Sequence, residues 1–194
     1  MRFSYSLASA SLGWSQSDWL MMAICFALIL LLIWLLRPVA ALIHEMGHAL
    51  PALILTKEIV EIQIGKPDEV ELGGKELGSQ QLETGLPPQK TGRLRWAFSF
   101  RSSLQGFTGY DRESLSRKAL LGVIAGGPFL SLMACGFGAW LTMDVFEQFL
   151  GKLFATTFLC LNLIVLVRSI IPVTLGNDCP SDCLDFWRTW RQVD

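Results

Sequence analysis

The sequence predicts an α-helical, polytopic membrane protein. It predicts a three-helix catalytic core, one N-terminal hydrophobic segment and a small antiparallel β element on the cytoplasmic side. Of the 194 residues, 52% are hydrophobic and the mean hydropathy is +0.43, which soluble domains seldom reach. Residues 19–36 and 119–143 carry no charge, and residues 149–171 carry only Lys152 and Arg168, near the two ends. At about 1.5 Å per residue, each run is long enough to cross about 30 Å of hydrocarbon.

Basic residues are distributed unevenly between the apolar runs. Residues 57–118 are rich in Lys and Arg, whereas the short link 144–148 has neither. By the positive-inside rule, residues 57–118 are cytoplasmic, the link lies outside, and the C-terminal tail with Arg188 and Arg191 returns to the cytoplasm. No basic stripe typical of nucleic-acid binding is present in the sequence, so no nucleic-acid partner is expected. The apolar runs make the lipid bilayer an expected partner.

Composition divides the chain into six regions. They are an N-terminal tail (1–18), a hydrophobic segment with a histidine-bearing helix (19–56), a membrane-associated β and loop region (57–118), a second core helix (119–143), a third core helix with the segment after it (149–187) and a C-terminal tail (188–194). For residues 19–56 two interpretations remain open. Either two helices are broken at Pro38, or one long tilted helix follows a partly buried segment.

The region 57–118 contains stretches typical of half-buried strands. Apolar and polar residues alternate in "EIVEIQIG" (58–65), "EVELGG" (69–74) and "RLRWAFSF" (93–100), whereas Pro87 and Pro88 indicate a loop between the last two. We therefore expect a small antiparallel sheet near the membrane surface.

The chemistry is concentrated in "HEMGH", residues 44–48. The i, i+4 spacing places His44 and His48, which are the two histidines of the chain, on one helix face, so both imidazoles can reach one metal ion. Glu45 lies about 100° round the helix, close enough to act on a water at that metal. Because ionisable residues are costly in a membrane span, three within five residues indicate a shared purpose. Two histidines and a carboxylate favour a zinc hydrolase site, which needs a third protein ligand.

The third ligand is expected near the cytoplasmic end of another span. The segment after the last apolar run, "GNDCPSDCLDFW" (176–187), offers five candidates: Asp178, Cys179, Asp182, Cys183 and Asp185. Both carboxylate and thiolate suit zinc, so their chemistry leaves the choice among them open.

Taken in order, several motifs resemble those of the site-2 protease family of intramembrane zinc metalloproteases, in particular its compact members without a PDZ domain. "LIHEMGHALPALIL" (42–55) is similar to the zinc-binding helix of that family, and "VEIQIG" (60–65) and "GFTGY" (106–110) resemble its membrane-associated strands. "LLGVIAGGPFLSLMA" (120–134) and "SIIPVTLGNDCPSDCLDFWR" (169–188) resemble its two later motifs.

The resemblance implies specific roles. His44, His48 and Asp182 would bind one zinc ion per chain, with Glu45 as the general base. Substrate-binding positions would be Gly106, Gly109, Gly127, Pro128, Ser131 and Ser169. Ser131 and Ser169 stand where the family usually has asparagine, and Cys183 stands where it has glycine.

The expected function is a membrane-embedded zinc endopeptidase that cuts a membrane-protein substrate near the cytoplasmic face. An edge strand, around residues 59–64 or 106–110, would pair with the unwound substrate. Two alternatives remain: a zinc-binding pseudoprotease acting as a scaffold or chaperone, suggested by the three departures, and a transporter using His44 and Glu45 as a proton relay. The sequence does not predict the number of subunits.

Overall fold

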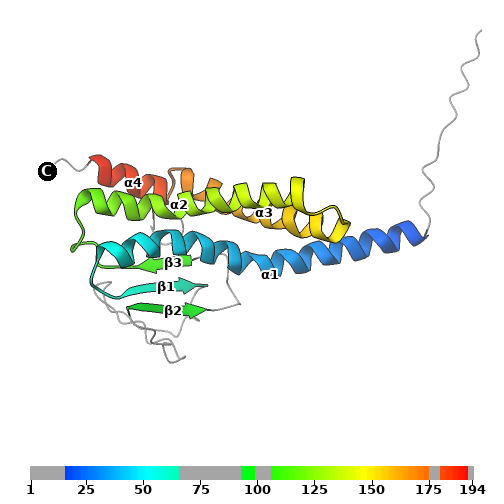
Figure 1. Ribbon diagram of the computed structural model, residues 1–194, viewed down its shortest axis with the longest axis horizontal. Coiled ribbons are helices and arrows are strands. Elements are labelled where there is room, and N and C mark those ends of the chain that lie inside the picture. The colour runs from blue at the N-terminus through cyan, green and yellow to red at the C-terminus, as the bar shows by residue number, and fades with distance from the viewer. Residues whose placement is uncertain (1–15, 66–92, 99–105, 175–179, 192–194) are drawn as a thin grey trace, which may run out of the picture.

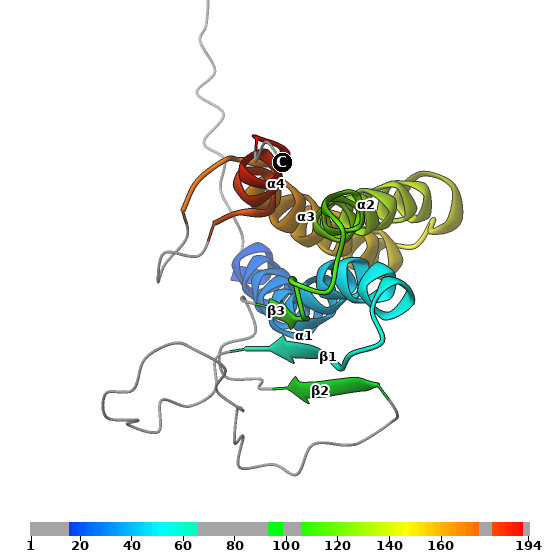
Figure 2. The same ribbon diagram turned by 90° about the vertical axis from the view of Figure 1, so that its left-hand side faces the viewer.

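The described part of this computed structural model covers residues 16–65, 93–98, 106–174 and 180–191, and contains four α-helices, one π-helical turn and three strands (Figure 1). The helices are α1 (Gln16–Leu55), α2 (Arg117–Trp140), α3 (Phe149–Ile170) and the short α4 (Asp182–Arg191). Seen along the bundle, α1 lies between the sheet on one side and helices α2, α3 and α4 on the other (Figure 2). Helix α1 therefore contacts every other layer of the molecule.

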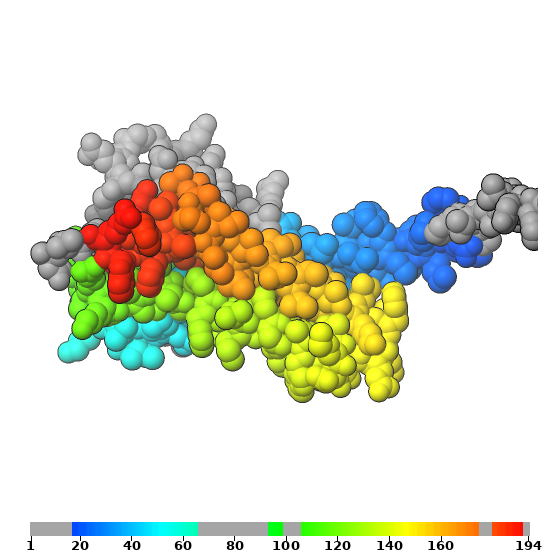
Figure 3. Space-filling model, turned by 90° about the horizontal axis from the view of Figure 1, so that it is seen from above, coloured from blue at the N-terminus to red at the C-terminus, as the bar shows by residue number. Residues whose placement is uncertain are grey.

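Helix α1 is continuous over 40 residues. The interpretation of two helices broken at Pro38 is therefore wrong, and the predicted N-terminal hydrophobic segment is the first half of the histidine-bearing helix. Pro38 and Pro51 both lie inside the helix, as prolines can where neighbouring helices enclose the backbone. The N-terminal part of α1 extends alone beyond the bundle (Figure 3).

Within the described residues, three helices are long and apolar enough to cross a membrane: Ser17–Leu55, Arg117–Val145 and Phe149–Ile170. The second of these comprises α2 and a π-helical turn, η2 (Leu141–Val145). The predicted core helices at 119–143 and 149–171 therefore exist with nearly the expected bounds. Large apolar side chains point outward along them, among them Phe26, Phe129 and Ile164, each more than 60% exposed. Such outward apolar surface suits contact with lipid.

Helices α1 and α2 approach each other closely at a pair of glycines. A Cβ atom at Gly47 would collide with the carbonyl oxygen of Gly126, and one at Gly126 would collide with the carbonyl oxygen of Gly47. Small residues permit this kind of helix contact in membrane proteins. The crossing brings α2 alongside the HEMGH turn of α1.

The strands β1 (Val60–Ile64), β2 (Leu94–Phe98) and β3 (Gly106–Gly109) form one sheet in the order β2-β1-β3. Strand β1 pairs antiparallel with β3, as expected, but parallel with β2. The prediction of a purely antiparallel sheet is therefore wrong. A parallel pair needs a crossover of about a dozen residues or more, and residues 65–93 are long enough to supply one. The strand expected at 69–74 and the loop at 87–88 lie outside the described residues.

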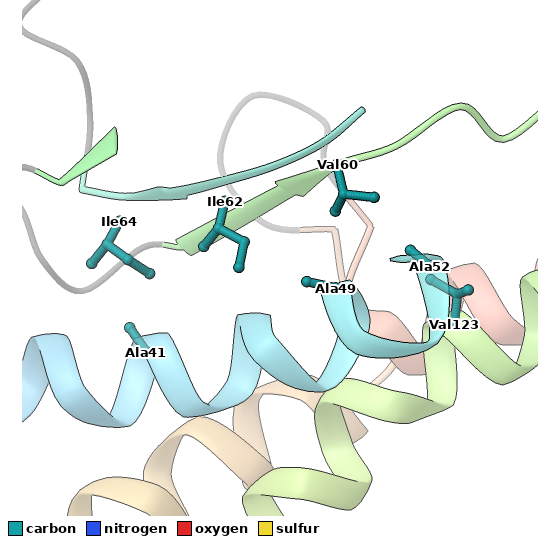
Figure 4. Packing of buried hydrophobic residues seen from close by; sticks show 7 residues of the cluster. All are labelled: Ala41, Ala49, Ala52, Val60, Ile62, Ile64 and Val123. Carbon is teal, nitrogen blue, oxygen red and sulfur yellow. The ribbon is translucent and has the colours of Figure 1, made fainter. Parts of the chain in front are cut away.

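The sheet packs on α1 through alternate residues of β1. Val60, Ile62 and Ile64 are each at most 2% exposed and face Ala41, Ala49 and Ala52 of α1, with Val123 of α2 beside them (Figure 4). Burying each branched side chain contributes about 1.5–3 kcal/mol relative to exposure. Alanines on α1 let β1 lie close to the helix, which places the sheet next to the HEMGH turn.

Candidate metal centre

Helix α1 contributes three buried polar side chains to the centre. His44, Glu45 and His48 are 8%, 7% and 8% exposed. Gly127 of α2 faces His48, and a Cβ at this position would collide with the imidazole ring. The glycine predicted from the family resemblance therefore lets α2 close over the histidine pair.

Helix α4 brings in the third side chain at its first residue, Asp182. The preceding Ser181 is 2% exposed, and its hydroxyl accepts hydrogen bonds from the backbone N–H groups of Leu184 and Val173. The Ser181 N–H in turn donates to the Val173 carbonyl at 2.9 Å. Ser181 thus caps α4, as serine commonly does at a helix start, and ties that start to the chain leaving α3. Asp182 is fixed in position as a result.

The three side chains converge on one point. His44 Nε2 lies 3.0 Å from Asp182 Oδ2, His48 Nε2 lies 3.5 Å from Asp182 Oδ1, and the two Nε2 atoms are 3.4 Å apart. Ligands about 2.0–2.2 Å from a tetrahedral metal ion are separated by about 3.3–3.6 Å. The separations of 3.4 Å and 3.5 Å fit this tetrahedral edge, and the separation of 3.0 Å is slightly shorter. His44, His48 and Asp182 can therefore hold a metal ion.

Hydrogen bonds behind the histidines orient their rings toward the same point. His48 Nδ1 lies 2.9 Å from the Val123 carbonyl, which can only accept, so Nδ1 carries the proton and Nε2 of the neutral ring carries a lone pair. His44 Nδ1 lies 2.9 Å from Ser131 Oγ, and Ser131 is 0% exposed. Such outer partners typically set the tautomer and orientation of metal-binding imidazoles. The two Nε2 atoms, 3.4 Å apart, can therefore share one proton or one metal ion.

The Asp182 carboxylate favours its charged form. Burial alone would raise its pKa, but hydrogen bonds from His44 and His48, together with the attraction of these rings, hold the pKa well below its ordinary value. A single proton can bridge only two of the converging atoms, whereas a metal ion can contact all three. Two imidazoles and one carboxylate are a donor set that can hold one metal ion.

Two arginines hold α4 against the rest of the molecule. Arg112, which follows β3, makes two hydrogen bonds of 3.0 Å to the two carboxylate oxygens of Asp185, and this contact raises the pKa of Arg112. Arg117, at the start of α2, donates to the carbonyls of Thr189 and Trp190 near the end of α4. Cations commonly stabilise helix C-termini in this way. Helix α4 is therefore anchored both in its first turn, which carries Asp182, and near its end.

Strand β3 covers the remaining polar group, Glu45. The Thr108 hydroxyl donates to Glu45 Oε2 at 2.6 Å and lies 3.2 Å from the Glu45 carbonyl. A Cβ at Gly106 would collide with the Glu45 side chain, so only glycine allows this close approach. The strand thus orients the glutamate carboxylate next to the histidine pair.

The other predicted site residues are placed as follows. Ser131 and Ser169 are both buried: the first faces His44, and the second is 6% exposed and donates to the Leu166 carbonyl of its own helix. Gly109 lies in β3, where a Cβ would make ordinary contacts, and Pro128 is partly buried in α2. Among the other candidate ligands, Asp185 binds Arg112 and Cys183 is a free cysteine, while Asp178 and Cys179 lie outside the described residues.

Sequence reasoning missed three contributors: Thr108, Ser181 and the Val123 carbonyl. A serine immediately before an acidic first turn is a helix-start signal, so Ser181 could have been found. Thr108 and Val123 act through contacts between distant segments, and local patterns do not reveal such contacts.

Comparison of the chain with protein-family models, with curated proteins and with solved structures finds no match. The functional argument therefore depends on the geometry of His44, Glu45, His48 and Asp182.

Proposed function

We propose that this chain is a multi-pass intramembrane zinc metalloendopeptidase, with its active site toward the cytoplasmic face. The observation that carries the proposal is the convergence of His44, His48 and Asp182 on one point, beside the oriented carboxylate of Glu45. The apolar helices and the resemblance to the site-2 protease family support the membrane setting and the substrate class. The expected partner is a membrane protein cut within or next to its transmembrane segment.

The residues of the chain divide the work of peptide hydrolysis. His44, His48 and Asp182 would hold zinc, which supplies Lewis-acid chemistry when bound by lowering the pKa of water and polarising a carbonyl. Glu45 takes a proton from the attacking water as the new C–O bond forms. It then passes that proton to the amine nitrogen as the C–N bond breaks. Thr108 holds the Glu45 carboxylate in place, and Ser131 and the Val123 carbonyl keep the imidazoles aligned.

Strand β3 is the element best placed to receive the substrate backbone. Strand β1 is central in the sheet, so the candidate edge at residues 59–64 is wrong, whereas β3 pairs only with β1 within the described sheet. An unwound segment that adds to the other edge of β3 would have its backbone groups satisfied and would lie next to Glu45.

Cleavage of a model transmembrane substrate by the purified, zinc-loaded protein tests the proposal. Wild type should cut the substrate, and Glu45→Gln should lose activity by about a thousandfold or more while still binding zinc, because it loses the general base but keeps the ligands. Glu147→Gln changes an exposed glutamate at the far end of the bundle and serves as the matched control. Equal cleavage by wild type and Glu45→Gln would rule out the proposed catalytic role.

A second candidate is a zinc-binding scaffold without protease activity. The observation that favours it is the cover that β3 places over Glu45, since Thr108 and Gly106 both contact its side chain. The same comparison separates the two candidates. A scaffold binds zinc but cuts no substrate in either wild type or Glu45→Gln.

A further inference from the structure

Arg37 is a basic residue far from both ends of α1, where no chemistry described so far requires it. Its neighbours Leu36, Pro38 and Ala40 are buried, and Arg37 itself is partly exposed. Its Nε atom is buried and has no hydrogen-bond partner within the described residues. A charged side chain inside a membrane span is costly and usually marks a functional site.

Packing places Arg37 near the middle of the bilayer, given the membrane topology of the proposed function. Leu36 packs in one cluster with Ala134 of α2 and Phe158 of α3. Phe158 lies nine residues after the start of Phe149–Ile170 and twelve before its end, or about 14 Å and about 18 Å along the helix. A lipid phosphate at either surface is therefore distant, and the partner of Arg37 has to come from within the span.

A second buried polar atom flanks the same cluster. Asn162, one helical turn beyond Phe158, is 0% exposed, and its amide nitrogen donates to the Phe158 carbonyl at 2.9 Å. Its Oδ1 atom has no partner and is, with Arg37 Nε, one of two such buried side-chain atoms in the described part of the chain. One atom is a donor and the other an acceptor, and buried polar groups are normally paired. The donor Arg37 Nε, on a partly exposed side chain, points to an acceptor group at this depth. Asn162 Oδ1 is itself an acceptor and is fully buried, so it marks the bundle interior as polar here but does not bind that acceptor.

Arg37 also lies on the face of α1 that carries the metal ligands. It precedes His44 by seven residues, which is 20° short of two full turns and about 10 Å along the axis. That distance corresponds to about three residues of an extended peptide. A segment bound next to His44 and continuing toward the outer face would therefore pass Arg37.

We propose that Arg37 forms an intramembrane subsite for an acidic side chain of the transmembrane substrate. The guanidinium of Arg37 pairs with the carboxylate, and such charge-assisted hydrogen bonds are strong in a low-dielectric setting. The subsite selects substrates with Asp or Glu about three extended residues to the outer side of the scissile bond. This inference rests on the proposed function for its substrate class, but the binding it describes needs neither zinc nor cleavage.

Peptide binding to the full-length Glu45→Gln protein in phosphatidylcholine nanodiscs tests the subsite. Three fluorescent single-span peptides are compared: one with Glu at the midpoint, one with Gln there, and one with the Glu moved four residues toward the outer end. The midpoint Glu peptide should bind about tenfold more tightly than either of the others. Adding Arg37→Gln should remove this preference, while Arg37→Lys retains part of it and Lys152→Gln, an exposed change at the outer end of α3, retains all of it.

The peptide comparison keeps the test decisive even if Arg37→Gln does not fold, because it can be made with Arg37 intact. Equal binding of the midpoint Glu and Gln peptides overturns the subsite. A Glu preference that persists in folded Arg37→Gln overturns it as well. If the chain proves not to be a protease, the preference for the midpoint Glu peptide can still be observed. If the subsite does not exist, zinc binding and cleavage are unaffected. The two outcomes are therefore distinguishable.

Discussion

Replacing Ser131 by alanine should weaken zinc binding without touching a metal ligand. Ser131 Oγ lies 2.9 Å from His44 Nδ1, and Ser131 is fully buried. Removing the hydroxyl therefore leaves His44 Nδ1 without this partner at a position that the substitution does not open to water. Removing an outer partner of a metal-binding histidine typically costs about 10–100-fold in metal affinity, which is about 1.4–2.7 kcal/mol. An unsatisfied buried polar group costs about 1–3 kcal/mol, which agrees with that range.

Ser169→Ala is the matched control for this prediction. Like Ser131, Ser169 is a buried serine in a long apolar helix, but its hydroxyl donates to the carbonyl of Leu166 in its own helix. Competition titration against a fluorescent zinc chelator should give a zinc Kd about 10–100-fold higher for Ser131→Ala and nearly unchanged for Ser169→Ala. Identical zinc affinities for the two variants would refute the assigned role of Ser131.

Three further predictions concern the other groups of the centre. Thr108→Val should lower kcat about 10–100-fold with little change in KM, because the 2.6 Å hydrogen bond to Glu45 is lost. Thr108→Ser keeps a hydroxyl and should retain most of the wild-type kcat. Steady-state cleavage kinetics measure kcat and KM for both variants, and a normal kcat for Thr108→Val argues against a role for this hydrogen bond. Asp182→Ala should strip zinc as measured by metal analysis, whereas Cys183→Ala should retain it; the reverse result would move the third ligand to the cysteine. In the metal-free protein, the pKa of Asp182 is lower in the folded than in the unfolded state, so its contribution to stability is present above the unfolded pKa of about 3.9 and is lost as pH falls. The loss of thermal stability in Asp182→Asn should therefore shrink when melting is measured below about pH 4, and a loss that grows toward acid contradicts the assignment.

The helical part of the fold follows from the sequence because its signals are local. Charge-free runs of sufficient length identify the apolar helices, and the i, i+4 spacing places His44 and His48 on one face. Whether Pro38 breaks α1 depends instead on packing around it, and the structure shows one uninterrupted helix. The alternation of apolar and polar residues correctly predicted strands at β1 and β2. The direction of pairing depends on how the chain connects the two strands, so the parallel pairing of β1 and β2 was not predicted.

The site shows the same division between local and distant contacts. His44, Glu45 and His48 were recognised from five consecutive residues, whereas the sequence alone left five candidates for the third ligand and only the family resemblance pointed to Asp182. Ser131 was assigned to substrate binding by resemblance, yet the structure places it behind His44. The position of such a side chain depends on contacts between residues far apart in the chain, and helical or strand periodicity does not predict those contacts.

X-ray absorption at the zinc edge, combined with metal analysis of the purified protein, tests the central claim most directly. The account predicts one zinc ion per chain, with only nitrogen and oxygen neighbours at about 2.0–2.2 Å from His44, His48, Asp182 and a solvent molecule. A sulfur neighbour at about 2.3 Å would place a cysteine in the site, and absence of stoichiometric zinc would contradict the metal centre itself.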